Sequence, residues 1–200
     1  MWTTSDGNEL SQTLADQNWA VVPSFISSLE VHELSLEIDK LQHANQLRPA
    51  GIGRGDRTGI HPEIRRDVIC WLDPPSIPAP QKRLLSQLEE LKVYLNRALF
   101  LGLRTMEGHV ALYPEGGFYR RHLDRFQDDD ARVISIVLYL NNHWQREWGG
   151  QLKLYLGEQG LVEEVQPTGG TLVAFLSDQI PHEVIPALRP RKSFAGWYRR

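Results

Sequence analysis

The second half of the chain consists of short apolar stretches with the period of β-strands, and this feature constrains the fold most. Apolar residues alternate with polar or small ones over residues 106–112, 152–156 and 194–198, a pattern typical of half-buried strands. The run from Val133 to Leu140 is apolar almost throughout, as expected of a strand that is covered on both faces. We predict some seven short strands in this half.

Two helices are predicted before these strands. Ser27 and Glu30 form a capping-box pattern, and an apolar stripe with helical spacing follows it. A second helix is expected after Pro80, where leucines recur every three or four residues. Because helices do not alternate with the strands, we do not expect a doubly wound sheet. The pattern predicts a mainly β fold with flanking helices, either a β-sandwich or a jelly roll, and of these we expect the double-stranded β-helix, or jelly-roll, core.

We expect the chain to form a single domain, since 200 residues is an ordinary domain size. Residues 1–104 would supply helical support and residues 105–200 the jelly-roll core. Residues 48–63 fit neither a helix nor a strand, because they contain four glycines and two prolines among several charges. Two interpretations of this long loop remain open, a functional lid and a disordered segment.

Charge and hydropathy restrict the partners. The net charge of −3 disfavours a broad nucleic-acid interface, and the acidic run Asp128–Asp130 points the same way. The first residues lack the basic and apolar regions of a signal peptide. No apolar run approaches the ~20 residues that span a bilayer. We therefore expect a cytoplasmic protein, monomeric, without nucleic-acid or membrane partners.

A histidine and a carboxylate stand two residues apart at His122 and Asp124. Residues i and i+2 of an extended chain point to the same face, so both side chains can reach one ion. His182 is the best candidate for a third ligand. Two histidines and one carboxylate leave three coordination positions of an octahedral iron open. The tripeptide alone is a weak signal, and the hypothesis depends on the residues around it.

A strand near the end of the chain supplies the first of these. Arg191, Ser193, Ala195 and Trp197 share one face of a strand, so a cation, two small side chains and a tryptophan would form a narrow slot. A guanidinium binds a carboxylate through two hydrogen bonds, as a dicarboxylic cosubstrate requires at its far end. Tyr139 lies on the apolar strand, and its hydroxyl needs a partner if it is buried.

Taken together, these residues resemble the prolyl-hydroxylase branch of the Fe(II)- and 2-oxoglutarate-dependent oxygenases, specifically the hypoxia-type enzymes and their compact bacterial relatives. The similarity covers about two thirds of the chain. The matching stretches are Tyr113-Pro114, Tyr119 to Asp124, Leu138 to Asn141, Trp148-Gly149-Gly150, Pro181 to Val184 with Pro186-Ala187, Arg191, Trp197-Tyr198 and, upstream, Ile64 to Asp67 with Ile69 to Trp71.

The resemblance implies that His122, Asp124 and His182 ligate iron. It also implies that Arg191 and Tyr139 bind the distal carboxylate of 2-oxoglutarate. The cofactors would be Fe(II), 2-oxoglutarate and dioxygen, with ascorbate as an optional reductant.

Other matches concern the pocket and the substrate. Tyr113 and Trp197 would line the pocket near the metal, and Arg132 would contact the substrate. Arg65 and Asp67 would form a pair that anchors residues 50–63 as a lid over a peptide. One residue fewer separates Tyr113 from His122 than in the family, and Ala195 stands where the hypoxia-type enzymes carry a hydroxylated side chain.

The resemblance implies a dioxygenase that hydroxylates a prolyl residue in a protein substrate and releases succinate and carbon dioxide. For a bacterial relative, it implies a translation factor as the target. Two alternatives stay open. One is a 2-oxoglutarate oxygenase that acts on a free small molecule or a nucleobase, and the other is a jelly-roll binding protein without catalytic activity.

Overall fold

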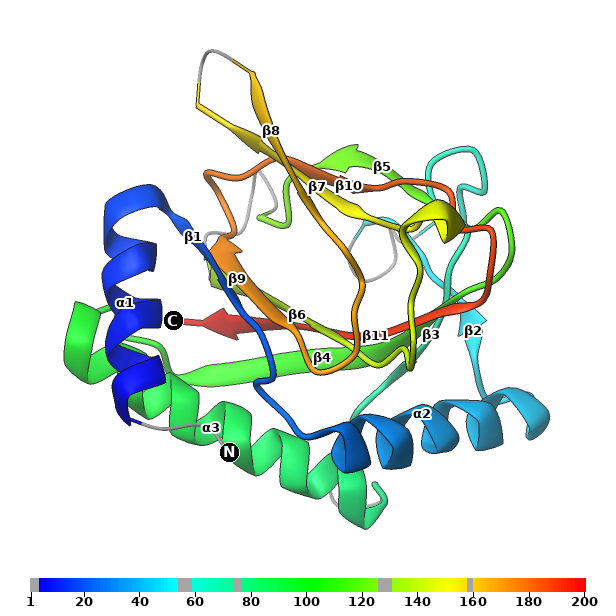
Figure 1. Ribbon diagram of the computed structural model, residues 1–200, viewed down its shortest axis with the longest axis horizontal. Coiled ribbons are helices and arrows are strands. Elements are labelled where there is room, and N and C mark those ends of the chain that lie inside the picture. Colours follow the sequence, from blue (N-terminus) through cyan, green and yellow to red (C-terminus); the bar gives the residue numbers. More distant parts are fainter. Residues whose placement is uncertain (1–3, 54–58, 74–76, 126–130, 158–159) are drawn as a thin grey trace.

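The computed structural model describes residues 4–53, 59–73, 77–125, 131–157 and 160–200. Two antiparallel sheets lie face to face, and helices cover the outer face of the larger one (Figure 1). The helices are α1 (Thr4–Gln17), α2 (Ser28–His43), α3 (Ala79–Leu99) and a short 3-10 helix, η2 (Arg146–Trp148). None of the helices in this described part combines the length and apolar character needed to cross a membrane.

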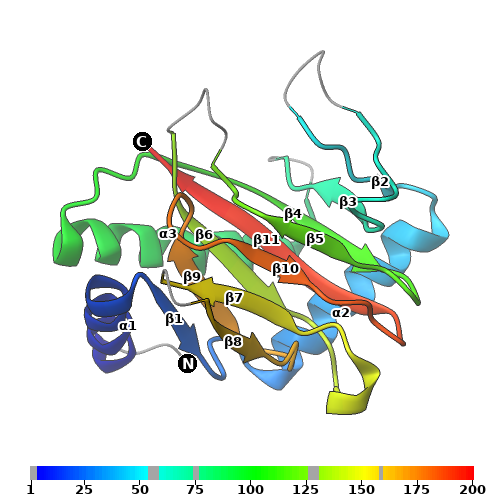
Figure 2. The same cartoon turned by 90° about the horizontal axis from the view of Figure 1, so that it is seen from above.

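The larger sheet has seven strands in the order β1-β9-β6-β11-β4-β3-β2, and the smaller sheet has four in the order β5-β10-β7-β8. Seen from above, the smaller sheet lies over the middle of the larger one (Figure 2). This arrangement confirms the expected mainly β fold with flanking helices and a jelly-roll core. The strands are β1 (Trp19–Val22), β2 (Arg48–Pro49), β3 (Val68–Trp71), β4 (Thr105–Tyr113), β5 (Tyr119–His122), β6 (Arg132–Tyr139), β7 (Leu152–Leu156), β8 (Leu161–Val165), β9 (Leu172–Leu176), β10 (His182–Val184) and β11 (Arg191–Arg199).

Two hydrophobic clusters follow from the period of the strands. Leu112 packs in the cluster under the helices, whereas its neighbours Ala111 and Tyr113 belong to the cluster between the two sheets. The same alternation along β11 places Phe194 under the helices and Arg191 in the space between the sheets. The larger sheet is therefore covered on both faces, which explains the apolar run of β6.

Both predicted helices are present. Ser27 caps α2 and forms the complete capping box with Glu30, and the predicted leucines of α3 are fully buried except Leu99, which is partly buried. Helix α1 was not expected, because it is mostly polar and Leu10 and Leu14 are the buried large apolar side chains among the residues whose burial is described. Two leucines are too few to indicate a helical stripe.

Backbone pairing holds the described parts of the segment 48–63. It begins with β2, and Ile52 and Gly59 form an isolated bridge. Residues 54–58 of this segment and the acidic run Asp128–Asp130 lie outside the described residues.

Candidate metal and cosubstrate site

The two histidines come from neighbouring strands of the smaller sheet. Strands β5 and β10 pair antiparallel, and their register sets His122 directly opposite His182. Asp124 follows β5 after one intervening residue. Pairing of two short strands therefore brings together residues that are sixty positions apart in the sequence, as the predicted metal site requires.

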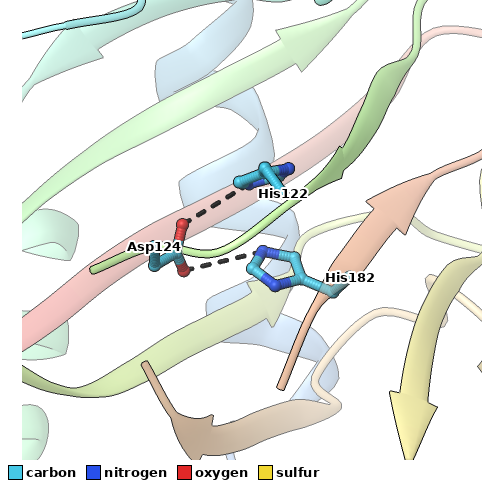
Figure 3. A group of neighbouring side chains, drawn as sticks. All are labelled: His122, Asp124 and His182. Atoms are coloured by element: carbon cyan, nitrogen blue, oxygen red, sulfur yellow. Dashed lines mark ion pairs between the residues drawn. The ribbon is translucent and has the colours of Figure 1, made fainter. Parts of the chain in front are cut away.

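The three side chains converge on one point (Figure 3). Their ligand atoms all lie within 4.8 Å of one another. One carboxylate oxygen, Oδ1 of Asp124, lies 3.5 Å from Nε2 of His122, and the other, Oδ2, lies 3.6 Å from Nε2 of His182. These separations suit three ligands that share an ion.

The backbone fixes which ring nitrogen of each histidine is available. Nδ1 of His122 lies 2.7 Å from the carbonyl oxygen of Arg120, and Nδ1 of His182 lies 3.1 Å from that of Ile180. A carbonyl only accepts, so each Nδ1 carries the proton, and each Nε2 offers its lone pair toward Asp124. Metal-ligating histidines are commonly oriented by such a bond from the other nitrogen.

The charge state of the group also suits a cation. Burial alone would raise the pKa of Asp124, but the neighbouring His182 and His122 and the Ser135 hydroxyl outweigh it and hold this pKa well below its usual range. Burial lowers the pKa of His182 to about 4. At neutral pH the site therefore holds one negative carboxylate and a neutral His182, the protonation states that metal binding needs.

A cavity of about 360 Å³ connects this group to Arg191. It lies between the two sheets, and the whole predicted slot of Arg191, Ser193, Ala195 and Trp197 lines it. The strand parity predicted from the sequence is therefore correct. Tyr113, which faces Arg191 across the β4–β11 pairing, also lines the cavity.

Arg191 is 1 % exposed. Its Nε donates to the carbonyl oxygen of Gly150 at 2.8 Å and its Nη1 to Oγ of Ser193 at 3.3 Å, while Nη2 has no partner in the described part of the chain. A buried guanidinium with an unused donor is costly unless an acceptor completes it.

The groups around this guanidinium fit a carboxylate. The Arg191 guanidinium carbon lies 4.8 Å from the ring centre of Tyr113 and 5.1 Å from that of Tyr139. The Tyr139 hydroxyl is buried and makes no hydrogen bond of good geometry to the described residues. Burial raises its pKa to about 12, although the nearby Arg191 opposes this shift, so the hydroxyl remains a donor. Two unused donors and a fixed positive charge suit an acceptor-only anion, such as the far carboxylate of 2-oxoglutarate.

The opposite part of the cavity is aromatic. Trp197 is 8 % exposed, and the Arg132 guanidinium lies 3.8 Å from its ring centre. Arg132 also bonds to Glu107 at 2.8 Å and to the backbone carbonyl of Asp124 at 3.2 Å. Arg132 therefore lies beside the metal group.

Arg65 and Asp67 form the predicted ion pair. The guanidinium binds the carboxylate through two bonds, Nε to Oδ1 at 2.7 Å and Nη2 to Oδ2 at 2.5 Å. Arg65 also stacks on Tyr119, which in turn stacks on His122 at 3.6 Å between ring centres. The pair thus connects the start of the loop, through Gly51, to the metal ligands.

Several residues that shape the site were not predicted. Trp71 and His109 line the cavity and contact Trp197 through their rings. Ser135 donates to the metal-facing carboxylate, and Gly150 fixes Arg191. Gly150 belongs to the stretch Trp148-Gly149-Gly150 that matches the family, and this match was the one sequence signal for it. The match did not indicate what Gly150 does.

His109 predicts a pH effect on stability. Burial lowers its pKa from 6.5 to about 4, so as pH falls the unfolded chain takes up the proton before the folded one. The unfolding free energy of the metal-free protein should therefore decrease between pH 6.5 and pH 4, by about 3 kcal/mol for this residue.

Denaturant titrations across this pH range test the effect. His109→Leu should give a flatter pH dependence than the wild type, with the contribution of His182 remaining. The same change at the exposed His32 is the control. A His109→Leu protein that loses stability with falling pH as steeply as the wild type would contradict the assignment.

Comparison with known proteins agrees with this geometry. Residues 108–199 match the model of the 2OG-Fe(II) oxygenase superfamily. The prolyl hydroxylase EGLN3 of Mus musculus is 31 % identical over 175 residues, which cover 84 % of this chain and 73 % of that protein. A hypoxia-inducible factor prolyl hydroxylase of Caenorhabditis elegans is 28 % identical over 94 % of this chain, but the chain spans 27 % of that protein's length.

Two solved structures extend the similarity to the fold. A Pseudomonas putida prolyl-4-hydroxylase is 41 % identical, with a TM-score of 0.87 and coverage of 97 % of this chain and 98 % of that one. A Trichoplax adhaerens prolyl hydroxylase, bound to a peptide fragment of hypoxia inducible factor, is 27 % identical with a TM-score of 0.87, covering 96 % of this chain and 88 % of that one. This chain therefore belongs to the 2OG-Fe(II) oxygenase superfamily, and within it to the prolyl hydroxylases.

Proposed function

We propose that this protein hydroxylates a prolyl residue in an exposed segment of another protein and consumes 2-oxoglutarate and dioxygen in the reaction. The observation that carries the proposal is the single cavity with two different ends. The group of His122, Asp124 and His182 lies at one end and Arg191 at the other. Bacterial and animal relatives named as prolyl hydroxylases support the substrate class.

Each end has a separate task. His122, Asp124 and His182 would hold Fe(II), and Arg191 with Tyr139 would bind the far carboxylate of 2-oxoglutarate. The bound iron and cosubstrate would supply the oxidation, in which one oxygen atom enters the proline ring while 2-oxoglutarate becomes succinate and carbon dioxide. The protein itself orients these groups and excludes water from the cavity between the sheets.

The aromatic part of the cavity would hold the substrate. Trp71, His109 and Trp197 form a wall of three rings with centres 4.9 to 6.1 Å apart. Such a wall offers flat apolar contacts to a proline ring. Arg132 lies at its edge, and Arg65 with Asp67 holds the start of residues 50–63, which would close over the peptide. The peptide held by the Trichoplax adhaerens relative supports a peptide substrate here.

The test is to incubate the purified protein with Fe(II), 2-oxoglutarate and a cell extract, and to search by mass spectrometry for prolines that gain one oxygen atom. Translation factors are the first candidates among the products. A modified prolyl peptide that requires 2-oxoglutarate is the expected result. Succinate released with free proline or a methylated oligonucleotide, and no modified protein, would overturn the substrate class.

We further propose that the protein acts as a cytoplasmic monomer.

Gly150 gives a prediction for cosubstrate binding. Its φ is +71°, and a Cβ there would lie 3.0 Å from Cδ of Arg191 and 3.2 Å from Cβ of Ala187. Gly150→Ala should therefore cost about 1–2 kcal/mol of stability through backbone strain and, by displacing Arg191, weaken 2-oxoglutarate binding about 10-fold or more.

Gly157→Ala is the matched control, because Gly157 has a φ of +60° with nothing within 4 Å of its missing Cβ. It should lose similar stability but bind 2-oxoglutarate as the wild type does, measured by calorimetry on the Mn(II)-loaded proteins. Equal affinities of the two variants would show that Gly150 does not position Arg191.

A further inference from the structure

Ser135 makes a direct hydrogen bond to Asp124. It lies on β6, is 1 % exposed, and its Oγ donates to Oδ2 of Asp124 at 2.7 Å. Ser177, on the segment after β9, is fully buried and its Oγ lies 2.9 Å from that of Ser135. Two buried hydroxyls therefore stand in line behind one carboxylate oxygen.

The donors and acceptors of these two hydrogen bonds follow from the charge of Asp124. An ionised carboxylate only accepts hydrogen bonds, so the single hydroxyl proton of Ser135 is committed to Asp124. Ser177 must then donate to Ser135. Charge-assisted hydrogen bonds of this kind are strong, and a chain of hydroxyls strengthens them further.

Distances to the histidines do not distinguish the two carboxylate oxygens of Asp124, but the hydrogen bond from Ser135 does. Oδ1 lies 3.5 Å from His122 Nε2 and Oδ2 lies 3.6 Å from His182 Nε2, so both are within reach of an ion between the imidazoles. A carboxylate that used both oxygens would occupy two coordination positions. Only two positions of an octahedral ion would then remain, one fewer than the three that a cosubstrate with two ligand atoms and dioxygen need.

We propose that Ser135, supported by Ser177, occupies Oδ2 and so keeps Asp124 a ligand through one oxygen, which leaves the third position open. Ser135 is in this sense a positioning residue that acts through Asp124. The inference rests on the proposed function, because it presumes iron and 2-oxoglutarate at this site.

Ser135→Ala is the direct test, with Ser135→Thr as the conservative variant. In Ser135→Ala the released Oδ2 competes with 2-oxoglutarate for the metal, so the affinity for 2-oxoglutarate should fall about 10-fold or more, the size expected for the loss of one hydrogen bond to a charged group. The affinity for the metal should fall less, because all three ligands remain. Ser135→Thr keeps the hydroxyl and should restore both affinities.

Two anaerobic titrations measure these affinities. Mn(II) titration of the metal-free protein gives metal binding, and 2-oxoglutarate titration of the Fe(II)-loaded protein, followed by its charge-transfer absorption, gives cosubstrate binding. Ser177→Ala removes a buried hydroxyl one bond further from Asp124 and should cause a smaller loss. If removal of a hydroxyl acted only by loosening the core, Ser177→Ala and Ser135→Ala would lose affinity for metal and cosubstrate alike, and the proposal would be wrong.

The remaining outcomes separate this inference from the proposed function. A wild type that binds 2-oxoglutarate beside a Ser135→Ala variant that binds it equally well would overturn the role of Ser135 alone. A wild type that takes up no 2-oxoglutarate in the presence of Fe(II) would overturn the proposed function, and this inference with it.

Discussion

Arg191→Met is expected to weaken 2-oxoglutarate binding by about 2–5 kcal/mol, or about 30- to 5000-fold, because it removes a fully desolvated cation from its carboxylate. The structure leaves Nη2 of Arg191 and the hydroxyl of Tyr139 without partners among the described residues. The cosubstrate would supply the acceptor for both. Calorimetric titration of the Mn(II)-loaded variant and wild type measures the difference.

The same substitution should have the opposite effect on the free protein. Arg191 is buried beside Tyr113 and Tyr139 and lines the cavity. A methionine of similar length carries no charge, so its burial has no cost of desolvating a charge. Replacing even a paired buried charge by apolar residues is often neutral or stabilising, and Arg191 has no counter-ion in the described part of the chain. We expect the unfolding free energy without cosubstrate to rise by about 1 kcal/mol, measured by denaturant titration.

Arg191→Lys is the control for charge. It keeps the cation but loses the planar fork, so its binding should be intermediate and its stability should not increase. A site that binds 2-oxoglutarate equally well with methionine and arginine at position 191 would refute the assigned role. A loss of both binding and stability in Arg191→Met would instead show that Arg191 has mainly a structural role.

Part of this site could be predicted from the sequence. The slot on β11 was predictable because a strand has a period of two, so Arg191 and Trp197 had to share a face. The metal group was predictable in part, since His122 and Asp124 are local in sequence. Its third member, His182, was assigned from the residues around it, and the β5–β10 register shows why it lies there.

The supporting residues were not predictable in the same way. Ser135 reaches Asp124 from a different sheet, and a serine within an apolar run gives no sign of such a contact. No pattern in the sequence singles out His109, yet it lines the cavity beside Trp71 and Trp197. Contacts between the two sheets, as for Ser135, and between strands that are distant in the sequence, as for His109, depend on tertiary packing and strand pairing rather than on local periodicity, so a single sequence does not display them.

The missed helix α1 has a related cause. Leu10 and Leu14 are buried because α3 and β1 pack beside this helix. Tertiary packing, rather than a helical pattern in the sequence, stabilises this element.

Asp124→Asn is expected to abolish the metal site while preserving its shape. The two carboxylate oxygens lie 3.5 and 3.6 Å from the Nε2 atoms of His122 and His182. An amide places an NH₂ group at one of these positions, where it would donate to the lone pair that the metal needs. The site loses its only negative ligand as well. The 2-oxoglutarate-dependent release of succinate should fall by more than the ~10–100-fold typical of losing an outer partner.

Metal binding can be measured apart from activity. A metal that binds only the folded state stabilises it by mass action, so Mn(II) should raise the Tm of the wild type and leave that of Asp124→Asn unchanged. Asp67→Asn is a matched control, because Asp67 is another buried carboxylate, with a fully buried side chain paired to Arg65.

The two asparagine variants should therefore differ in their stability and in the response of their Tm to Mn(II). Asp67→Asn leaves Arg65 as a buried cation without its counter-ion, which should lower stability by about 3–5 kcal/mol, yet its Tm should still rise with Mn(II) because the three metal ligands are intact. Asp124→Asn should lose the response to Mn(II). A clear increase in the Tm of Asp124→Asn on addition of Mn(II) would show that the ion is held elsewhere and that His122, Asp124 and His182 are not the metal site.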